Sequence, residues 1–324
     1  MACRFGVCRP RVRDRLFHDG RPALVCPRPA THPGDGTGSL PQKEANSVTD
    51  HDRSGGDGFP QRYGPWALVA GASEGLGAAY ARALAARGMN LVLVARRGGP
   101  LEDLATQIGA AYGVEIRCYD GDLASDTFLN DLLAACSVLD LGLVVCNAAQ
   151  APIGDLASRD REDLMRVVDV NVRAPMVLLR ALLPGMIDRG RGAVVLMSSF
   201  TGNLGTPRIA SYAASKAFLR VLGESLWYEL KDQGIRVVAC SAGAIRTPGY
   251  AAAAGKDAPG TLDAEKVVEH TLRSLDRGPV VMPGLVNRLS TLFMTRVLPR
   301  RAAIGILARS TSGLAQVKET KGQQ

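Results

Sequence analysis

The sequence has few aromatic residues, no closely spaced cysteine pair and no long apolar run. Aromatic residues make up only 5 % of the 324 residues, whereas glycine, with 36 residues, is abundant. This balance disfavours an aromatic-rich β-sandwich and favours an α/β fold with many tight turns. Because no apolar stretch approaches the roughly 18 to 20 residues of a transmembrane helix, we expect a soluble protein and not an integral membrane protein.

Cysteine usage points to a reducing compartment. The seven cysteines are an odd number, none forms a CxxC pair, and the N-terminus does not have the pattern of a secretory signal peptide. We therefore expect a cytoplasmic location. Three cysteines and two histidines near the N-terminus match no zinc-binding spacing, so we predict no metal site; they are Cys3, Cys8, Cys26, His18 and His32.

The net charge of +8 is unevenly distributed and suggests three regions. Residues 1–60 carry nine basic and seven acidic groups, residues 61–284 carry 23 of each, and residues 285–324 carry seven basic groups and one acidic group. Residues 1–60 are rich in Arg, Pro, Gly and Asp without a hydrophobic period, which predicts a disordered extension. Its arginines suggest a mitochondrial transit peptide, but Asp14 and Asp19 interrupt them, and a dispensable leader is the alternative.

From Trp66 onwards, short apolar segments alternate with helical patterns. Strands are predicted at 67–70, 91–94, 115–119, 141–146, 193–197, 236–240 and 279–282, and helices at 78–87, 102–112, 126–136, 161–186, 212–233 and 261–277. Strands that are apolar on both faces and separated by helices predict a parallel sheet covered on both sides. The expected fold of residues 61–284 is a single doubly wound, Rossmann-type α/β domain.

The first predicted strand leads through a glycine-rich turn with GxxxGxG spacing into a helix. Glycines let the backbone approach a pyrophosphate, whose charge the helix N-terminus stabilises. The turn predicts a dinucleotide site, with a purely structural turn as the alternative. We expect cofactor contacts from Gly71, Ser73, Glu74, Gly75, Leu76 and Gly77.

Two arginines follow the second predicted strand, where an NAD-binding domain often has a carboxylate for the ribose hydroxyls. Arg96 and Arg97 cannot accept those hydrogen bonds, but a guanidinium pairs bidentately with a 2′-phosphate. The sequence therefore favours NADP over NAD. Solvated arginines at a strand end are the alternative, and Glu74 would oppose an extra phosphate if it lay close.

Tyr212 and Lys216 are four residues apart at the start of a predicted helix and so lie on one face. A phenol is a poor proton donor and acceptor at neutral pH, and a nearby ammonium is expected to lower its pKa.

In order along the chain, Gly71–Gly77, Asn147-Ala148-Ala149, Asn171, Ser198-Ser199, Tyr212 and Lys216 form a joint pattern. Over roughly residues 64–250 this pattern resembles the compact branch of the short-chain dehydrogenase/reductase family. The resemblance implies a hydride-transferring oxidoreductase that interconverts a carbonyl and a secondary alcohol. The family's serine lies about thirteen residues before its tyrosine, which selects Ser199, with Ser198 as its neighbour.

The resemblance also implies roles for individual residues. Tyr212 would exchange a proton with the substrate oxygen and Ser199 would hydrogen-bond to it, while Lys216 would lower the pKa of Tyr212 and hold the nicotinamide ribose. Asn171 would support a water linked to Lys216. Independently, Pro175 cannot donate a hydrogen bond to the Asn171 carbonyl within a helix, which leaves that carbonyl free for water unless the proline is merely a kink.

Further cofactor contacts follow from the same resemblance. Asp122, with Leu123, matches an aspartate near the adenine, and Thr247 matches a threonine at the nicotinamide carboxamide. Asn147 would support the central strand, with Ala148 beside the cofactor. The sequence has Ala149 where the family has glycine, and Ala242-Gly243 where the family has Pro-Gly.

The C-terminal region combines an apolar stripe with positive charge. Leu285, Leu289, Leu292, Phe293 and Val297 recur at helical spacing among four arginines. Peripheral contact with an anionic membrane is one interpretation, and docking on the body or on a second subunit of a homodimer or homotetramer is the other. Without aromatic platforms we do not expect nucleic-acid binding.

Together these observations predict an NADP(H)-linked oxidoreductase for an apolar, lipid-like carbonyl or alcohol, for example a 3-oxoacyl substrate. The alternative is a non-catalytic nicotinamide-binding sensor or scaffold.

Overall fold

The structure is a computed structural model that describes residues 58–247, 250 and 257–321, with side chains up to residue 312. The disordered extension predicted over residues 1–60, including its cysteines and histidines, lies outside the described residues up to residue 57. The described body begins with α1 (Phe59–Tyr63), where Phe59 and Tyr63 are both buried. The boundary of the body is therefore at least two residues earlier than expected.

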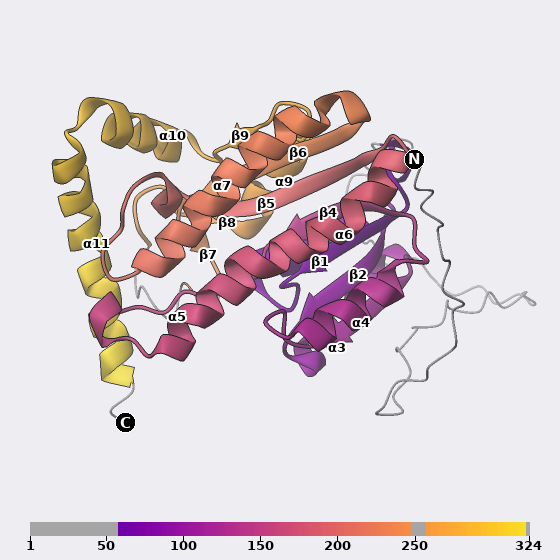
Figure 1. The fold of residues 1–324 in the computed structure, drawn as a ribbon, viewed down its shortest axis with the longest axis horizontal. Helices are drawn as coiled ribbons and strands as arrows, with labels where there is room; N and C mark the ends of the chain where they lie inside the picture. Colours follow the sequence, from indigo (N-terminus) through magenta and orange to yellow (C-terminus); the bar gives the residue numbers. More distant parts are fainter. Residues whose placement is uncertain (1–57, 248–249, 251–256, 322–324) are drawn as a thin grey trace, which may run out of the picture.

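Seven parallel strands form the central sheet, in the order β3-β2-β1-β4-β5-β6-β9 (Figure 1). The order reverses between β1 and β4, so their carboxyl ends flank the crevice in which such folds bind ligands. This topology confirms the predicted doubly wound, Rossmann-type α/β fold. The strands are β1 (Trp66–Ala70), β2 (Asn90–Ala95), β3 (Ile116–Asp120), β4 (Leu141–Cys146), β5 (Gly192–Ser199), β6 (Ile235–Ala242) and β9 (Val280–Val281).

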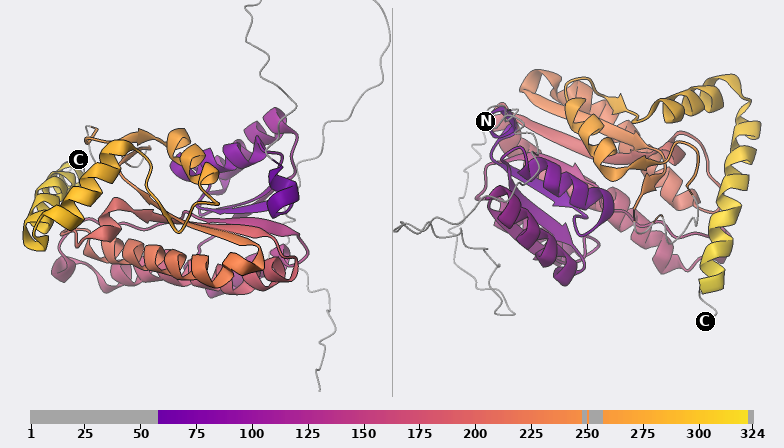
Figure 2. Two further views of the ribbon diagram at one scale, coloured as in Figure 1. Left: turned by 90° about the horizontal axis from the view of Figure 1, so that it is seen from above. Right: turned by 180° about the vertical axis from the view of Figure 1, so that it is seen from behind.

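Helices cover both faces of the sheet (Figure 2). One apolar core packs the first face under α2 (Gly75–Ala85), α3 (Gly98–Tyr112) and α9 (Ala264–Arg273). The second core packs the other face under α4 (Asp126–Cys136), α6 (Ala174–Asp188) and α7 (Ala210–Leu230). Alternate residues of each strand enter different cores: Val69 contributes to the first and Leu68 to the second, because side chains alternate across a sheet.

The helix predicted over 161–186 contains a wider turn in its middle. It consists of α5 (Arg161–Val168), a π-helical turn η2 (Asp169–Arg173) and α6, which has Pro175 at its start. The Ala174 N–H bonds to the Asp169 carbonyl, five residues earlier. Because Pro175 has no N–H, the normal ladder is interrupted beside Asn171, as the sequence indicated.

This same stretch, Arg161–Asp188, is 28 residues long and contains an 18-residue window with a mean hydropathy of 1.3, so it meets the length and composition of a membrane span. The expectation that no segment would do so was wrong. Leu178, Leu179 and Met186 on this stretch are buried in the second core, so it packs as a layer of the fold.

The C-terminal segment extends from one end of the molecule (Figures 1 and 2). After the short pair β7 (Ile245–Arg246) and β8 (Leu262–Asp263), α9 and β9, it forms α10 (Leu285–Leu292), a π-helical turn η5 (Phe293–Val297) and α11 (Arg300–Lys321). The apolar stripe is helical as predicted, whereas α11 was not predicted as a separate helix. Met294, Ala303 and Leu307 form a small third core with Leu204.

Candidate active site

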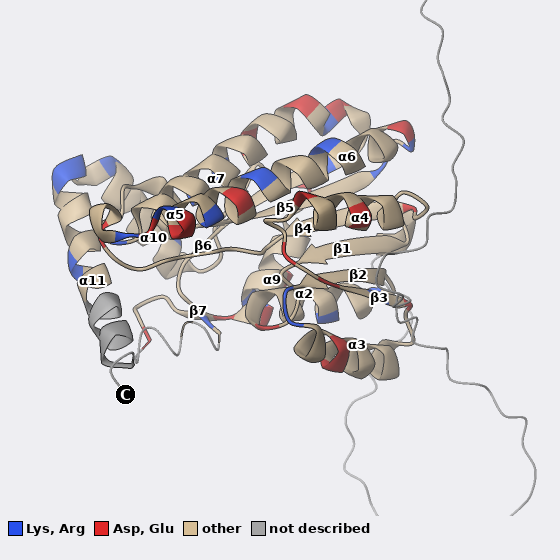
Figure 3. Ribbon diagram, turned by 60° about the horizontal axis from the view of Figure 1, so that its bottom comes forward, with Lys and Arg blue, Asp and Glu red and all other residues tan. Residues whose placement is uncertain are grey.

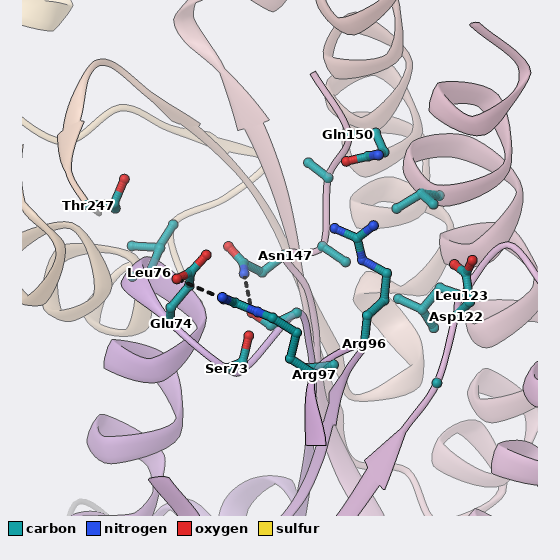
Figure 4. Close-up of a pocket in the computed structure, with 17 residues that line it drawn as sticks. Ser73, Glu74, Leu76, Arg96, Arg97, Asp122, Leu123, Asn147, Gln150 and Thr247 are labelled. Carbon is teal, nitrogen blue, oxygen red and sulfur yellow. Dashed lines mark hydrogen bonds and ion pairs between the residues drawn. The ribbon is translucent and has the colours of Figure 1, made fainter. Parts of the chain in front are cut away.

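A pocket of about 630 Å³ lies at the carboxyl ends of β1, β2 and β4 (Figure 4). Twelve residues predicted to contact a cofactor line it: Gly71, Ser73, Glu74, Gly75, Leu76, Arg96, Arg97, Asp122, Leu123, Asn147, Ala148 and Thr247. Gly77, Tyr212 and Lys216 do not. Sequence reasoning missed five lining residues, Ala95, Gly121, Ala149, Gln150 and Val170. The roles of the twelve predicted residues as cofactor contacts stay predictions, but the fold does gather these distant segments in one place.

Gly71 and Gly77 in the loop are required for different structural reasons. Gly71 has φ +83°, and a Cβ there would lie 2.7 Å from the Cα of Ala148. Gly77 lies under the loop, where a Cβ would lie 1.9 Å from the Gly71 carbonyl oxygen. Only glycine fits either position. Gly77 thus allows the helix to pack against the loop and does not itself face the pocket.

The residues present fit a dinucleotide. α2 begins at Gly75, whose φ is +56°, and no side chain caps its N-terminal N–H groups. Those N–H groups and the positive end of the helix favour an anion. The Asn147 Nδ2 donates a hydrogen bond of 2.9 Å to the Gly71 carbonyl and so holds the loop against the end of β4. Pyrophosphate is the group that this cradle would hold.

Arg96 and Arg97 have different environments in the pocket. The Arg97 Nη2 lies 2.8 Å from the Glu74 Oε2, and the two side chains point toward each other in Figure 4. Arg96 forms no ion pair with any described residue. Glu74 is therefore close to the arginines, as the sequence allowed, and it partly neutralises the charge of Arg97 but not that of Arg96.

Asp122 is held by an arginine that the sequence did not reveal. Its Oδ2 accepts a hydrogen bond of 2.7 Å from the Arg166 Nη2 on α5, and its Oδ1 accepts one of 3.0 Å from the Ala124 N–H. Burial acts to raise the pKa of Asp122, but these two hydrogen bonds and the charges of Arg166 and Arg96 lower it overall. Asp122 is an ionised member of a charged cluster in the wall of the pocket.

The predicted serine and tyrosine come together from β5 and α7. The Ser199 Oγ accepts hydrogen bonds from the Thr201 N–H at 3.3 Å and from the Thr201 Oγ1 at 3.0 Å. Its own hydroxyl hydrogen is not used by Thr201, and the Ser199 hydroxyl lies near enough to Tyr212 to lower the pKa of the phenol. Thr201 was not predicted. The only sequence signal for the contact of Thr201 with Ser199 was a hydroxyl side chain two residues after that serine.

Lys216 is buried under the site. Its Nζ donates a hydrogen bond of 2.7 Å to the Met197 carbonyl and lies 5.4 Å from the centre of the Tyr212 ring. Burial lowers the pKa of Lys216 to about 8. Ser198 donates its hydroxyl to the Lys216 carbonyl at 2.7 Å, which ties β5 to α7. Lys216 and Ser198 thus set how Ser199 and Tyr212 face each other.

The predicted direction for the Tyr212 pKa was wrong in this structure. Burial raises the pKa of Tyr212, and the hydrogen bond with Ser199 offsets only part of that rise. The sequence argument counted the charge of Lys216, but here the ammonium is bound to the Met197 carbonyl and desolvation of the phenol dominates. Tyr212 is a protonated phenol at neutral pH.

Asn171 links two segments around the site. Its Oδ1 accepts a hydrogen bond of 2.7 Å from the Gln150 N–H, and its Nδ2 donates to the Gln150 carbonyl and to the Ser215 Oγ, both at 2.9 Å. Asn171 is completely buried. It holds the segment after β4 against α7 beside Lys216. Gln150 and Ser215 carried no motif from which sequence reasoning could have found them.

Comparison with known proteins gives matches over the same region. The sequence profile described as short chain dehydrogenase matches residues 65–257. The chain is 32 % identical over 233 residues to a 7beta-hydroxysteroid dehydrogenase of Clostridium sardiniense, covering 71 % of this chain and 89 % of that protein. It is 35 % identical over 181 residues to a very-long-chain 3-oxoacyl-CoA reductase of Phaeosphaeria nodorum, covering 54 % of this chain and only 53 % of that reductase.

A human protein named inactive hydroxysteroid dehydrogenase-like protein 1 is also 35 % identical, over 55 % of this chain and 54 % of its own length. Among solved structures, a short-chain dehydrogenase from Sphingobium yanoikuyae in complex with NADPH has a TM-score of 0.65 and 32 % identity, covering 72 % of this chain and 93 % of that one. The chain thus spans about half the length of some curated relatives and nearly all of others.

Proposed function

The chain belongs to the short-chain dehydrogenase/reductase family, and we propose that it uses NADP(H) to interconvert a ketone and a secondary alcohol on an apolar, lipid-like substrate. The family membership makes it an NAD(P)-dependent oxidoreductase of CH–OH and C=O groups. The observation that carries the catalytic part of the proposal is that the Ser199 and Tyr212 hydroxyls lie close together and that the buried Lys216 ammonium lies 5.4 Å from the centre of the Tyr212 ring.

The proposed mechanism divides the work between cofactor and protein. The nicotinamide, when bound, supplies or accepts the hydride. For reduction, the Tyr212 hydroxyl donates its proton to the carbonyl oxygen, and the Ser199 hydroxyl donates a hydrogen bond to the same oxygen. Thr201 fixes Ser199 by donating to its Oγ. The raised pKa of Tyr212 keeps the proton in place until the substrate oxygen becomes basic.

The preference for NADP(H) is supported by charge at the rim of the pocket. Arg96 forms no ion pair with described residues, is exposed, and lines the pocket beside the glycine loop. A guanidinium there can pair with a 2′-phosphate, but it offers no acceptor to the ribose hydroxyls of NAD. A similar protein binds NADPH, which agrees with this choice.

An apolar substrate is supported by the relatives. Their names describe steroid and very-long-chain acyl substrates, and both classes present a ketone or alcohol on a large hydrocarbon body. Purified protein is to be assayed for NADPH and NADH oxidation with a 3-oxoacyl thioester, a ketosteroid and a small ketone. The proposal expects turnover with NADPH and one of the first two. Turnover with the small ketone alone would contradict the substrate class.

A second candidate is a non-catalytic nicotinamide-binding protein, which the inactive human relative favours. A scaffold has no need for the buried ammonium of Lys216, whose desolvation is costly. Tight NADPH binding without turnover across a wide set of carbonyls and alcohols would support the scaffold and count against an enzyme.

A further inference from the structure

The helix α10 has its apolar residues on the outside. Six large apolar side chains of α10 and η5 are 51 to 69 % exposed: Leu285, Val286, Leu289, Leu292, Phe293 and Val297. On the inner side, Asn287 is buried and donates hydrogen bonds to the carbonyls of Pro283 and Gly260. An amphipathic helix on a soluble body normally has the opposite orientation. We call these six residues the apolar ridge.

The packing of the segment fixes this orientation. A Cβ on Gly243 would lie 2.6 Å from the Asn287 Oδ1, so α10 sits close against the loop after β6. Met294 is buried in the third core with Leu204. The helix cannot turn its apolar ridge inward without losing these contacts, which means that the ridge is built to face outward.

The charged side chains of the segment that carries the apolar ridge all have one sign. Residues 285–312 contain five arginines and no aspartate or glutamate, and all five arginines are exposed: Arg288, Arg296, Arg300, Arg301 and Arg309. Figure 3 shows blue and no red along the coloured length of α11. Arg296 follows Leu292 by four residues, and helical spacing places it on the same side as the ridge.

We propose that the apolar ridge and its arginines bind the surface of an anionic lipid membrane. The apolar side chains would enter the boundary between headgroups and acyl chains, and the arginines would pair with lipid phosphates and carboxylates. A second copy of the chain fits less well, because a two-fold contact sets the patch against itself and brings arginines together without carboxylates from the segment. This inference does not depend on the proposed activity.

Membrane contact at this place has a consequence for the site. The third core joins the segment to Leu204, and the Thr311 Oγ1 donates to the Pro207 carbonyl at 3.1 Å. Leu204 and Pro207 belong to the stretch that connects Ser199 to the helix of Tyr212. A membrane bound by the apolar ridge would therefore lie next to the stretch that connects Ser199 to the helix of Tyr212.

The test is co-sedimentation of the full chain with vesicles of phosphatidylcholine mixed with phosphatidylserine, against vesicles of pure phosphatidylcholine. We expect binding to the mixed vesicles that weakens as salt is added. Replacing Arg296, Arg300 and Arg301 together by Gln should weaken partitioning by about fivefold per arginine, on the order of a hundredfold in all. The matched control replaces Arg82, Arg161 and Arg180, three exposed arginines elsewhere, by Gln and should bind like the unmodified chain.

A second set of variants tests the contribution of the apolar ridge to membrane binding. Leu289→Gln with Phe293→Gln should also lose binding, whereas Val138→Gln with Leu156→Gln, two exposed side chains elsewhere, should not. The proposal is overturned if the full chain ignores mixed vesicles at low salt or if both arginine triples lose binding equally. It is also overturned if light scattering shows that the Leu289 and Phe293 changes only dissociate an oligomer. NADPH oxidation without vesicles, measured on the same samples, tests the proposed activity separately.

Discussion

Glu74 and Arg97 form an ion pair of 2.8 Å at the mouth of the cofactor pocket, and Arg96 beside them has no such partner. The two neighbouring arginines are therefore not equivalent. Both side chains of the pair are about half exposed, so the pair itself contributes little to stability. The ion pair instead reduces the positive charge that Arg97 would present to a ligand in the pocket.

Substitutions of Glu74, Arg96 and Arg97 should change the affinity for NADP more than the affinity for NAD. Arg96→Ala should weaken NADP binding by roughly ten- to a hundredfold, the value of one charge-assisted contact. Arg97→Ala should have a smaller effect, and Glu74→Gln should strengthen NADP binding by up to about fivefold because it frees Arg97. Calorimetric titration with both cofactors measures this. Equal losses for NADP and NAD would contradict a 2′-phosphate contact.

The buried ammonium of Lys216 should cost stability. Its pKa is about 8 in the folded chain against 10.5 as the ordinary value, so between these values the unfolded chain binds more protons. The free energy of unfolding should rise with pH across that window, by up to about 3 kcal/mol from this group. In Lys216→Met this rise should disappear, and the variant should be inactive. Urea unfolding of both proteins from pH 7 to 10.5 gives the difference, and parallel curves would refute the burial of a charge.

Thr201 should act by orienting Ser199. Thr201→Val keeps the backbone N–H but removes the hydroxyl that donates to the Ser199 Oγ at 3.0 Å. We expect kcat to fall by roughly five- to tenfold, equivalent to one hydrogen bond, with cofactor affinity unchanged. Thr201→Ser should restore the rate. A loss of NADPH binding in the valine variant would instead indicate a general disturbance of the loop.

The raised pKa of Tyr212 predicts different pH profiles for the two directions. Carbonyl reduction needs the protonated phenol, so ionisation of Tyr212 should not lower the reduction rate between about pH 6 and 9. Alcohol oxidation needs the phenolate, so its rate should increase throughout that range. Steady-state rates in both directions provide the test, and a reduction rate that halves near neutral pH would show that the phenol ionises far more easily than its burial indicates.

The sequence was sufficient for the fold because its strands are apolar on both faces. Val69 and Leu68 could be placed in a covered sheet without knowing which helix covers them. The interruption near Asn171 followed from a single residue, Pro175, which has no N–H to donate. Both features depend on residues that are close in sequence, so they can be predicted without knowing which distant segments pack against them.

What the sequence could not supply depends on distant contacts. Arg166 meets Asp122 across 44 positions, and Asn171 meets Ser215 across the same separation. The sign of the Tyr212 pKa shift was missed because it depends on burial, which spacing along a helix does not report. The outward face of α10 was equally invisible, since a stripe predicts amphipathicity but not which side faces the body.

The central claim is that Tyr212 is the proton donor of a working reductase. The most direct measurement is the rate of NADPH-dependent ketone reduction by Tyr212→Phe beside its affinity for NADPH. Tyr228→Phe, which removes an exposed hydroxyl from the same helix, is the control. We predict that kcat falls by about 10²- to 10⁴-fold in Tyr212→Phe, with NADPH affinity nearly unchanged and the control fully active. Undiminished turnover in Tyr212→Phe would contradict the account.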